Sequence, residues 1–379
     1  MSLTLTEEQV ILKNSAHEFF AERIPVSMLR KLRDSADGQG FDASAWHEMA
    51  VLGWAGILVP EAYGGADFGY VGLGQVLEES GRTLAASPLL STALIGAPLL
   101  AAAGSAAQKE NSLNSVCGGQ RLLALAIDEG PRHDPELIRM RAARDGDDFV
   151  LNGEKNFVID GHVADQIIVV ARTAGESAAP GGLTLFLLET GAGGLTSTPT
   201  LMVDSRYVAQ MRFDNVRVNA EAVIGKIDGA WSVLEPILDG ARAGIAAEML
   251  GSGLEAFERT LAYLKLRQQF DVPIGSFQAL KHRAALMLCE IELTRSAVLA
   301  ALNALDNGDD DSAELASLAK AKACDMLELI SNEAVQMHGG IGMTDAEEIG
   351  FFLKRARVQQ QIFGDAGFHR DRYATLKGF

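Results

Sequence analysis

Cysteine is scarce in this sequence, and positive charge is outnumbered by negative charge. Cys117, Cys289 and Cys324 lie far apart and form neither a CxxC pair nor an even set that could build a disulfide framework. This usage predicts a reducing compartment, and we expect a cytoplasmic protein. The chain has 33 Lys and Arg against 50 Asp and Glu, a formal net charge of −17. Because a phosphate backbone requires a positive surface, we expect no nucleic acid partner, although a few local cations could hold an anionic cofactor or a CoA thioester.

Long apolar runs are also missing. The most apolar stretch, residues 85–104, is interrupted by Pro88 and Pro98, so we expect no membrane span. Charged residues are spread among the apolar ones in residues 1–25, as in an amphipathic helix and not as in a signal peptide.

No P-loop, HExxH, GxSxG or zinc-type cysteine spacing occurs, and we expect no metal site. Residues 251–256 match GxGxxA, but inside a helical pattern, which favours tight helix packing over dinucleotide binding.

The periodicity of apolar residues divides the chain into three sections. Residues 1–120 are expected to form an N-terminal helical domain, residues 121–227 a central antiparallel β domain, and residues 228–379 a C-terminal four-helix bundle. This is an α+β fold. In the middle section, residues 167–171, 183–188 and 208–218 are strand candidates, and Asn152-Gly153 predicts a hairpin turn. In the last section, Asp311 followed by Glu314 predicts a helix start.

Two segments of the C-terminal section carry specific motifs. Residues 263–278 read YLKLRQQFDVPIGSFQ, and residues 334–344 read AVQMHGGIGMT. They resemble the signatures YxxxRxQFGxPIxxFQ and QxHGGxGxT of the flavin-dependent acyl-CoA dehydrogenase family. Weaker matches follow in the same order over nearly the whole chain. Either segment alone could be a surface arginine or a helix C-cap, but the two in the right order favour a flavin clamp.

The resemblance implies an FAD cofactor that lies extended at a subunit interface. Planar arginine suits a phosphate, glutamines offer neutral donors and acceptors, and paired glycines let backbone N–H groups approach an anion. Asp271 stands where the family has glycine. The residues implied in FAD binding are Arg267, Gln269, Phe270, Gln278, Gln336, Gly339 and Gly340, with Phe157 as an aromatic contact to the flavin ring.

The sequence departs from the family where the flavin ring and the catalytic base are expected. Ala126 and Ile159 replace hydroxyl residues that contact the ring, and apolar replacements suit a core better than a polar ring edge. The family reaction removes a proton alpha to the thioester carbonyl and passes a hydride from the beta carbon to the flavin, which requires a carboxylate. Gly364 stands in place of the family's glutamate, and Ala241 occupies the alternative base position.

Two carboxylates could substitute for the missing base. Asp365 is displaced by one residue, and Glu248 lies about two turns beyond Ala241 on the same helix face. Each also has a structural interpretation, Asp365 in a charged surface network and Glu248 as a paired interface carboxylate.

The pattern from residue 339 to residue 372 resembles the smaller subunit of paired acyl-CoA dehydrogenases. We therefore expect a subunit for FAD-linked alpha,beta-dehydrogenation of an acyl-CoA thioester in fatty acid or sterol side-chain oxidation, with a partner supplying the base. The expected assembly is a homo-oligomer or a heterotetramer with a second acyl-CoA dehydrogenase subunit, and the electron acceptor is an electron-transfer flavoprotein or similar protein. Two alternatives stay open: a self-sufficient homo-oligomeric dehydrogenase that uses Asp365 or Glu248, and a flavin-free structural or CoA-binding subunit.

Overall fold

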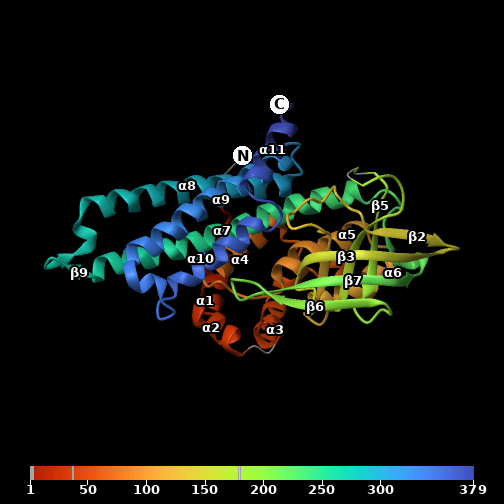
Figure 1. Ribbon diagram of the computed structural model, residues 1–379, viewed down its shortest axis with the longest axis horizontal. Helices are drawn as coiled ribbons and strands as arrows, with labels where there is room; N and C mark the ends of the chain where they lie inside the picture. Colours follow the sequence, from red (N-terminus) through yellow and green to blue (C-terminus); the bar gives the residue numbers. More distant parts are fainter. Residues whose placement is uncertain (1–3, 36–37, 178, 180) are drawn as a thin grey trace. The chain divides into compact units, whose positions relative to one another are not determined.

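The computed structural model describes residues 4–35, 38–177, 179 and 181–379 (Figure 1). The chain divides into two compact units. The first unit contains the described residues up to Lys31, Tyr70–Ala85 and Arg242–Phe379. The second contains the described residues of Leu32–Gly69 and of Ala86–Ala241.

The first unit is helical. Its helices, some of which begin or end in the second unit, are α1 (Glu7–Arg23), α2 (Val26–Ser35), α4 (Gly69–Arg82), α7 (Trp231–Leu266), α8 (Gln278–Asn307), α9 (Ser312–His338), α10 (Ile349–Gln361) and α11 (Ala366–Leu376). Two short strands, β9 (Gln268–Gln269) and β10 (Val272–Pro273), and two 3₁₀ turns, η5 (Ile274–Ser276) and η6 (Gly339–Met343), connect them. The long helices α8 and α9 run side by side, joined by a turn at Gly308 with φ of 67° (Figure 1). The expected C-terminal bundle is confirmed.

The start of α9 falls where the sequence predicts it, but for a different local reason. Asp311 is the N-cap residue, yet its side chain accepts no hydrogen bond from the first turn. Its φ of −92° and ψ of 9° are not the extended values of a capping residue, so the carboxylate does not reach the free N–H groups. The expected capping mechanism is therefore wrong at this helix.

Glycines allow α4 and α7 to approach closely. A Cβ atom on Gly251 would lie 1.7 Å from Glu78 O, and one on Gly81 would lie 2.0 Å from Glu248 O. The two helix backbones are thus in direct contact, and Ser252 Oγ donates to Gly81 O at 3.1 Å across the same seam. The GxGxxA match is a packing feature, as expected.

The second unit combines short helices with a sheet. Its helical elements are α3 (Ala43–Val51), η1 (Trp54–Gly56), η2 (Glu61–Tyr63), the π-helix η3 (Leu89–Gly96), α5 (Ala97–Ala103), α6 (Ala106–Cys117) and η4 (Ala220–Ala222). Its strands are β1 (Leu123–Ala126), β2 (Arg141–Asp145), β3 (Asp148–Ile159), β4 (Gln166–Arg172), β5 (Leu183–Glu189), β6 (Leu195–Leu201), β7 (Tyr207–Val218) and β8 (Val223–Ile224).

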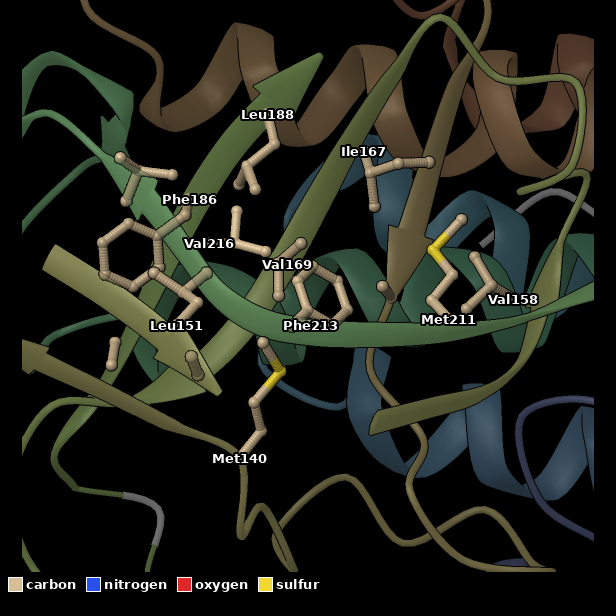
Figure 2. Close-up of a cluster of buried hydrophobic side chains, with 14 of the residues drawn as sticks. Met140, Leu151, Val158, Ile167, Val169, Phe186, Leu188, Met211, Phe213 and Val216 are labelled. Atoms are coloured by element: carbon tan, nitrogen blue, oxygen red, sulfur yellow. The ribbon is translucent and has the colours of Figure 1, made fainter. Parts of the chain in front are cut away.

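These strands form one sheet in the order β6-β7-β3-β2-β4-β5-β8, with β1 added beside β4. Most neighbours are antiparallel, whereas β1 with β4 and β2 with β4 are parallel. The three predicted strand segments correspond to β4, β5 and β7. Figure 2 shows Leu151, Val169, Phe186, Phe213 and Val216 converging from four strands on one buried apolar core.

The predicted hairpin at Asn152-Gly153 is wrong. Both residues lie inside β3, where the pairing with β7 shifts register between Leu151 and Gly153. Gly153 has φ of 148°, and a Cβ atom on it would lie 2.8 Å from Met140 Cγ, so glycine is required for a bulge and not for a turn. The hairpin turn is at residues 146–147, since Asp145 pairs with Asp148.

Among the described residues, no helix is both long enough and apolar enough to cross a membrane. The most apolar stretch instead folds into the short elements η3 and α5, with Pro98 in the first turn of α5.

Candidate cofactor-binding site

The segment that follows α7 folds into a short hairpin built from β9 and β10. Ile274 N donates to Arg267 O at 2.8 Å and closes the hairpin onto the end of the helix. The two turn residues, Phe270 and Asp271, have φ of 55° and 61°. Successive positive φ values define a type I′ turn, and aspartate tolerates this backbone better than most residues. Asp271 thus replaces the glycine of the family signature at the tip of the turn.

The polar side chains proposed for cofactor binding surround this hairpin. Arg267, Gln269 and Gln278 are exposed, and Phe270 is 86% exposed, with its ring edge-on to Phe277 at 6.0 Å. Within the described part of the chain, the Arg267 guanidinium makes no hydrogen bond or ion pair. An uncommitted guanidinium of this kind can bind a phosphate through two parallel hydrogen bonds.

The second motif forms the end of α9 and the turn after it. Gln336 is exposed on the last turn, and Gly339 ends the helix with φ of 65°. A Cβ atom on Gly339 or Gly340 would meet no atom within 4 Å. The glycine backbone here faces open space, which a ligand could occupy.

An aromatic stack joins the two motifs. Tyr263, on the last turns of α7, stacks on His338 at the end of α9, with ring centroids 4.4 Å apart and an interplanar angle of 23°. The buried His338 ring is oriented by its Nδ1, which donates to Ala334 O at 2.7 Å. The structure therefore brings together two segments that sequence reasoning identified separately. The stack itself was missed, although its two residues are part of the two motifs.

These residues fit the phosphate and adenine half of FAD. An exposed arginine without a protein partner, exposed glutamines and an open diglycine can together bind an anion and a polar ring. We call this set, Arg267, Gln269, Phe270, Gln278, Gln336, Gly339 and Gly340, the clamp.

The residues expected near a flavin ring are not all accessible to a ligand, unlike the clamp residues. Ala126 is 0% exposed and belongs to the apolar core, so it offers a ligand no contact. Phe157 is 44% exposed and has φ of 53°, next to a register shift in β3. The exposed ring of Phe157 can contact a ligand, whereas the buried Ala126 cannot. The structure thus fits a clamp better than it fits a complete ring pocket.

A buried ion pair holds the loop between β1 and β2 against β3. Lys155 is fully buried and donates to Glu129 Oε1 at 2.7 Å and to Ile127 O at 2.9 Å. Burial lowers the pKa of Lys155, and the Glu129 carboxylate opposes that shift. Glu129 also accepts hydrogen bonds from the backbone N–H groups of Arg139 and Met140. The carboxylate and the ammonium therefore hold the loop together. The alternation of β3, in which the buried residues Phe149, Leu151 and Lys155 share one face, was the signal for the inward direction of Lys155.

The four positions discussed for catalysis are placed as follows. Gly364 has φ of 101°, and Ala241 is completely buried. Asp365 is the N-cap of α11 and accepts the Phe368 N–H at 2.9 Å. Glu248 is buried and accepts from Gln359 Nε2 at 2.9 Å and Arg355 Nη1 at 3.4 Å. Both candidate carboxylates thus already have structural partners.

Comparison with known proteins identifies related sequences. The acyl-CoA dehydrogenase N-terminal, middle and C-terminal domains match residues 6–120, 127–216 and 228–375. The acyl-CoA dehydrogenase FadE12 of Mycobacterium tuberculosis is 32% identical over 332 residues, 86% of this chain and 85% of that protein.

Two solved structures cover all of this chain and are themselves fully covered. Butyryl-CoA dehydrogenase from Megasphaera elsdenii has a TM-score of 0.89 at 26% identity. A chain of the ChsE4-ChsE5 complex from Mycobacterium tuberculosis has a TM-score of 0.90 at 25% identity. The fold, the two motifs and these matches agree, and the chain belongs to the acyl-CoA dehydrogenase family of FAD-dependent oxidoreductases, which act on the CH–CH group of acyl-CoA thioesters.

Proposed function

We propose that this chain is the clamp-bearing subunit of a paired acyl-CoA dehydrogenase, and that a partner subunit supplies the catalytic base. The pair catalyses FAD-linked alpha,beta-dehydrogenation of an acyl-CoA thioester. Electrons pass to an electron-transfer flavoprotein or a similar acceptor, and the compartment is the cytoplasm.

The observation that carries this proposal is that the two base positions hold no carboxylate and that the nearest carboxylates already have structural partners. A general base must be within hydrogen-bonding reach of the proton it removes and must have a free lone pair. Residues 364 and 241 are glycine and alanine. Asp365 caps a helix, and Glu248 is buried against Arg355. Both carboxylates thus already hold parts of the fold, which supports a base that comes from another chain.

The exposure of the clamp residues also supports a pair in which this chain binds the cofactor and its partner supplies the base. Its arginine and glutamines are exposed and its diglycine is open, which supports a role in binding. The ring side has lost its hydroxyls at Ala126 and Ile159. A chain with an intact clamp and no base needs a second chain for catalysis. The likeness to a chain of the ChsE4-ChsE5 complex is consistent with a heteromeric arrangement.

The test is turnover by the purified chain with added FAD, butyryl-CoA or palmitoyl-CoA, and an artificial electron acceptor. We expect rates close to background, because loss of general-base catalysis alone costs about 10²- to 10⁴-fold. Butyryl-CoA dehydrogenase from Megasphaera elsdenii, assayed in parallel, is the positive control. Robust turnover that Asp365→Asn or Glu248→Gln abolishes would instead establish a self-sufficient enzyme.

A second measurement addresses the partner directly. The chain purified from its native host should bring a second acyl-CoA dehydrogenase-type polypeptide with it, and the complex should contain fewer flavins than polypeptides. A homo-oligomer with one flavin in every chain contradicts the paired arrangement.

A further inference from the structure

The two halves of the clamp come from parts of the chain that are far apart. Arg267 follows α7, whereas Gly339 and Gly340 follow α9. Both halves can bind one pyrophosphate at once only if the guanidinium and the diglycine turn are held at a fixed separation. A support that fixes this separation before the cofactor arrives raises affinity, because less conformational freedom is lost on binding. The residues between the two halves therefore decide how well the clamp binds.

His338 is tied to the diglycine half. The residue is 4% exposed, and its Nδ1 donates to Ala334 O at 2.7 Å, which fixes the ring against α9. The turn η6 folds over the histidine, since a Cβ atom on Gly342 would lie 2.9 Å from His338 Cβ. The position of the diglycine turn thus depends on the histidine beneath it.

Tyr263 connects the histidine to the arginine half. Its ring stacks on His338 with centroids 4.4 Å apart. The backbone N–H of Arg267 donates to Tyr263 O at 2.8 Å, and Arg267 O accepts from Ile274 N at 2.8 Å. The same tyrosine thus carries the stack and the hydrogen bond that leads into the hairpin. A continuous set of contacts therefore runs from the diglycine turn through the stack to the arginine.

We propose that His338 and Tyr263 are positioning residues for FAD, and that their stack sets the separation between Arg267 and the diglycine turn. Neither ring has to touch the cofactor. This inference deepens the proposed function and rests on it, because the clamp must bind FAD for its geometry to matter. When the stack is broken, each half still offers its donors, but holding both on the same pyrophosphate costs additional conformational entropy.

The test is a double-mutant cycle on FAD binding. FAD is titrated, with flavin fluorescence as the readout, into the apo form of the full chain in the assembly that it forms. His338→Ala should weaken binding about tenfold. Because the arginine is then misplaced, Arg267→Ala should cost about threefold less affinity, or still less, in this background than in the wild type. Tyr263→Leu should act as His338→Ala does, whereas Tyr263→Phe keeps the ring and should bind FAD like the wild type.

A matched control separates positioning from a general loss of stability. His369 on α11 is also buried, and its Nε2 donates to Phe363 O at 2.9 Å. Its helix packs on the first half of α9, whereas His338 is the last residue of α9. His369→Ala should also lower the melting temperature, but it should leave the cost of Arg267→Ala unchanged. Thermal unfolding verifies that each variant is folded, and Tyr263→Leu decides the question if His338→Ala does not fold.

An equal cost of Arg267→Ala in the wild type, His338→Ala and Tyr263→Leu overturns the inference. A reduction of that cost by His369→Ala as large as the one by His338→Ala overturns it as well, because any loss of stability would then act in the same way. If Arg267→Ala leaves the FAD affinity of the wild type unchanged, the clamp fails and so does the cofactor role in the proposed function. If Arg267→Ala weakens binding by the same factor in every background, only the positioning role fails.

Discussion

Replacing Glu248 with glutamine separates a structural carboxylate from a catalytic one. Glu248 Oε1 lies 3.4 Å from Arg355 Nη1, and their side chains are 4% and 1% exposed. Removing one partner of such a buried pair destabilises a protein by about 3–5 kcal/mol, because the other charge stays buried. Arg355 Nη2 also donates to Leu84 O at 3.2 Å, a bond that the substitution does not remove, and glutamine has the same shape as glutamate. We therefore expect a loss near the lower limit, about 3 kcal/mol.

The assay is urea unfolding followed by circular dichroism at helix wavelengths, and the matched control is Glu292→Gln. Glu292 also pairs with an arginine, Arg295 at 3.5 Å, but its side chain is 57% exposed. Solvent screens such a pair, so we expect a loss below about 1 kcal/mol. Equal losses in the two variants would refute the buried ion pair. A variant that keeps wild-type stability but loses turnover would identify Glu248 as the base.

Three further outcomes are expected. Arg267→Ala should weaken FAD binding in the functional assembly about 10- to 150-fold, because it removes a charge-assisted hydrogen bond of about 1.5–3 kcal/mol. The control variant Lys265→Ala should leave FAD binding unchanged, and an Arg267→Ala protein that titrates with flavin like the wild type would rule out the clamp. Light scattering should show a dimer or a tetramer, because we propose that the clamp binds a flavin held by a neighbouring chain, and a stable micromolar monomer contradicts this. Burial raises the pKa of the Cys117 thiol to about 11, so iodoacetamide at pH 8 should modify the exposed Cys289 much faster, as measured by peptide mass spectrometry.

Cys117 also predicts how stability depends on pH. Its folded-state pKa of about 11 lies above the ordinary value of 9.0, so the folded state favours the protonated thiol. The stabilisation from this group is complete below pH 9 and is lost as the pH rises toward 11. Cys117→Ala should therefore unfold with a weaker dependence on pH between 9 and 11, and an unchanged dependence would contradict the raised pKa.

The fold class and the family follow from local patterns. Periodicities of about 3.6 and 2 identify the bundle and most strands, because they depend only on which side of each element is buried. The two clamp motifs are recognisable for a similar reason, since each is a continuous run whose spacing is set by a helix end and a turn. The division into domains at residues 120 and 227 stays a prediction. The Asn152-Gly153 error shows the limit of such patterns, because whether glycine makes a turn or a bulge depends on the strand that pairs with it.

The roles of individual polar side chains depend on partners that are distant in the chain. Glu248 resembles a candidate base until Arg355, 107 residues away, is placed beside it. Lys155 is buried, and its charge is balanced by Glu129, which lies 26 residues away in the chain. Sequence spacing identifies neighbours three or four residues apart on a helix, whereas a buried charge pairs with whatever the packing brings within about 4 Å. Chain folding alone brings Tyr263 onto His338, and it turns the glycine at residue 364 from an apparent gap into a position that Phe368 fills.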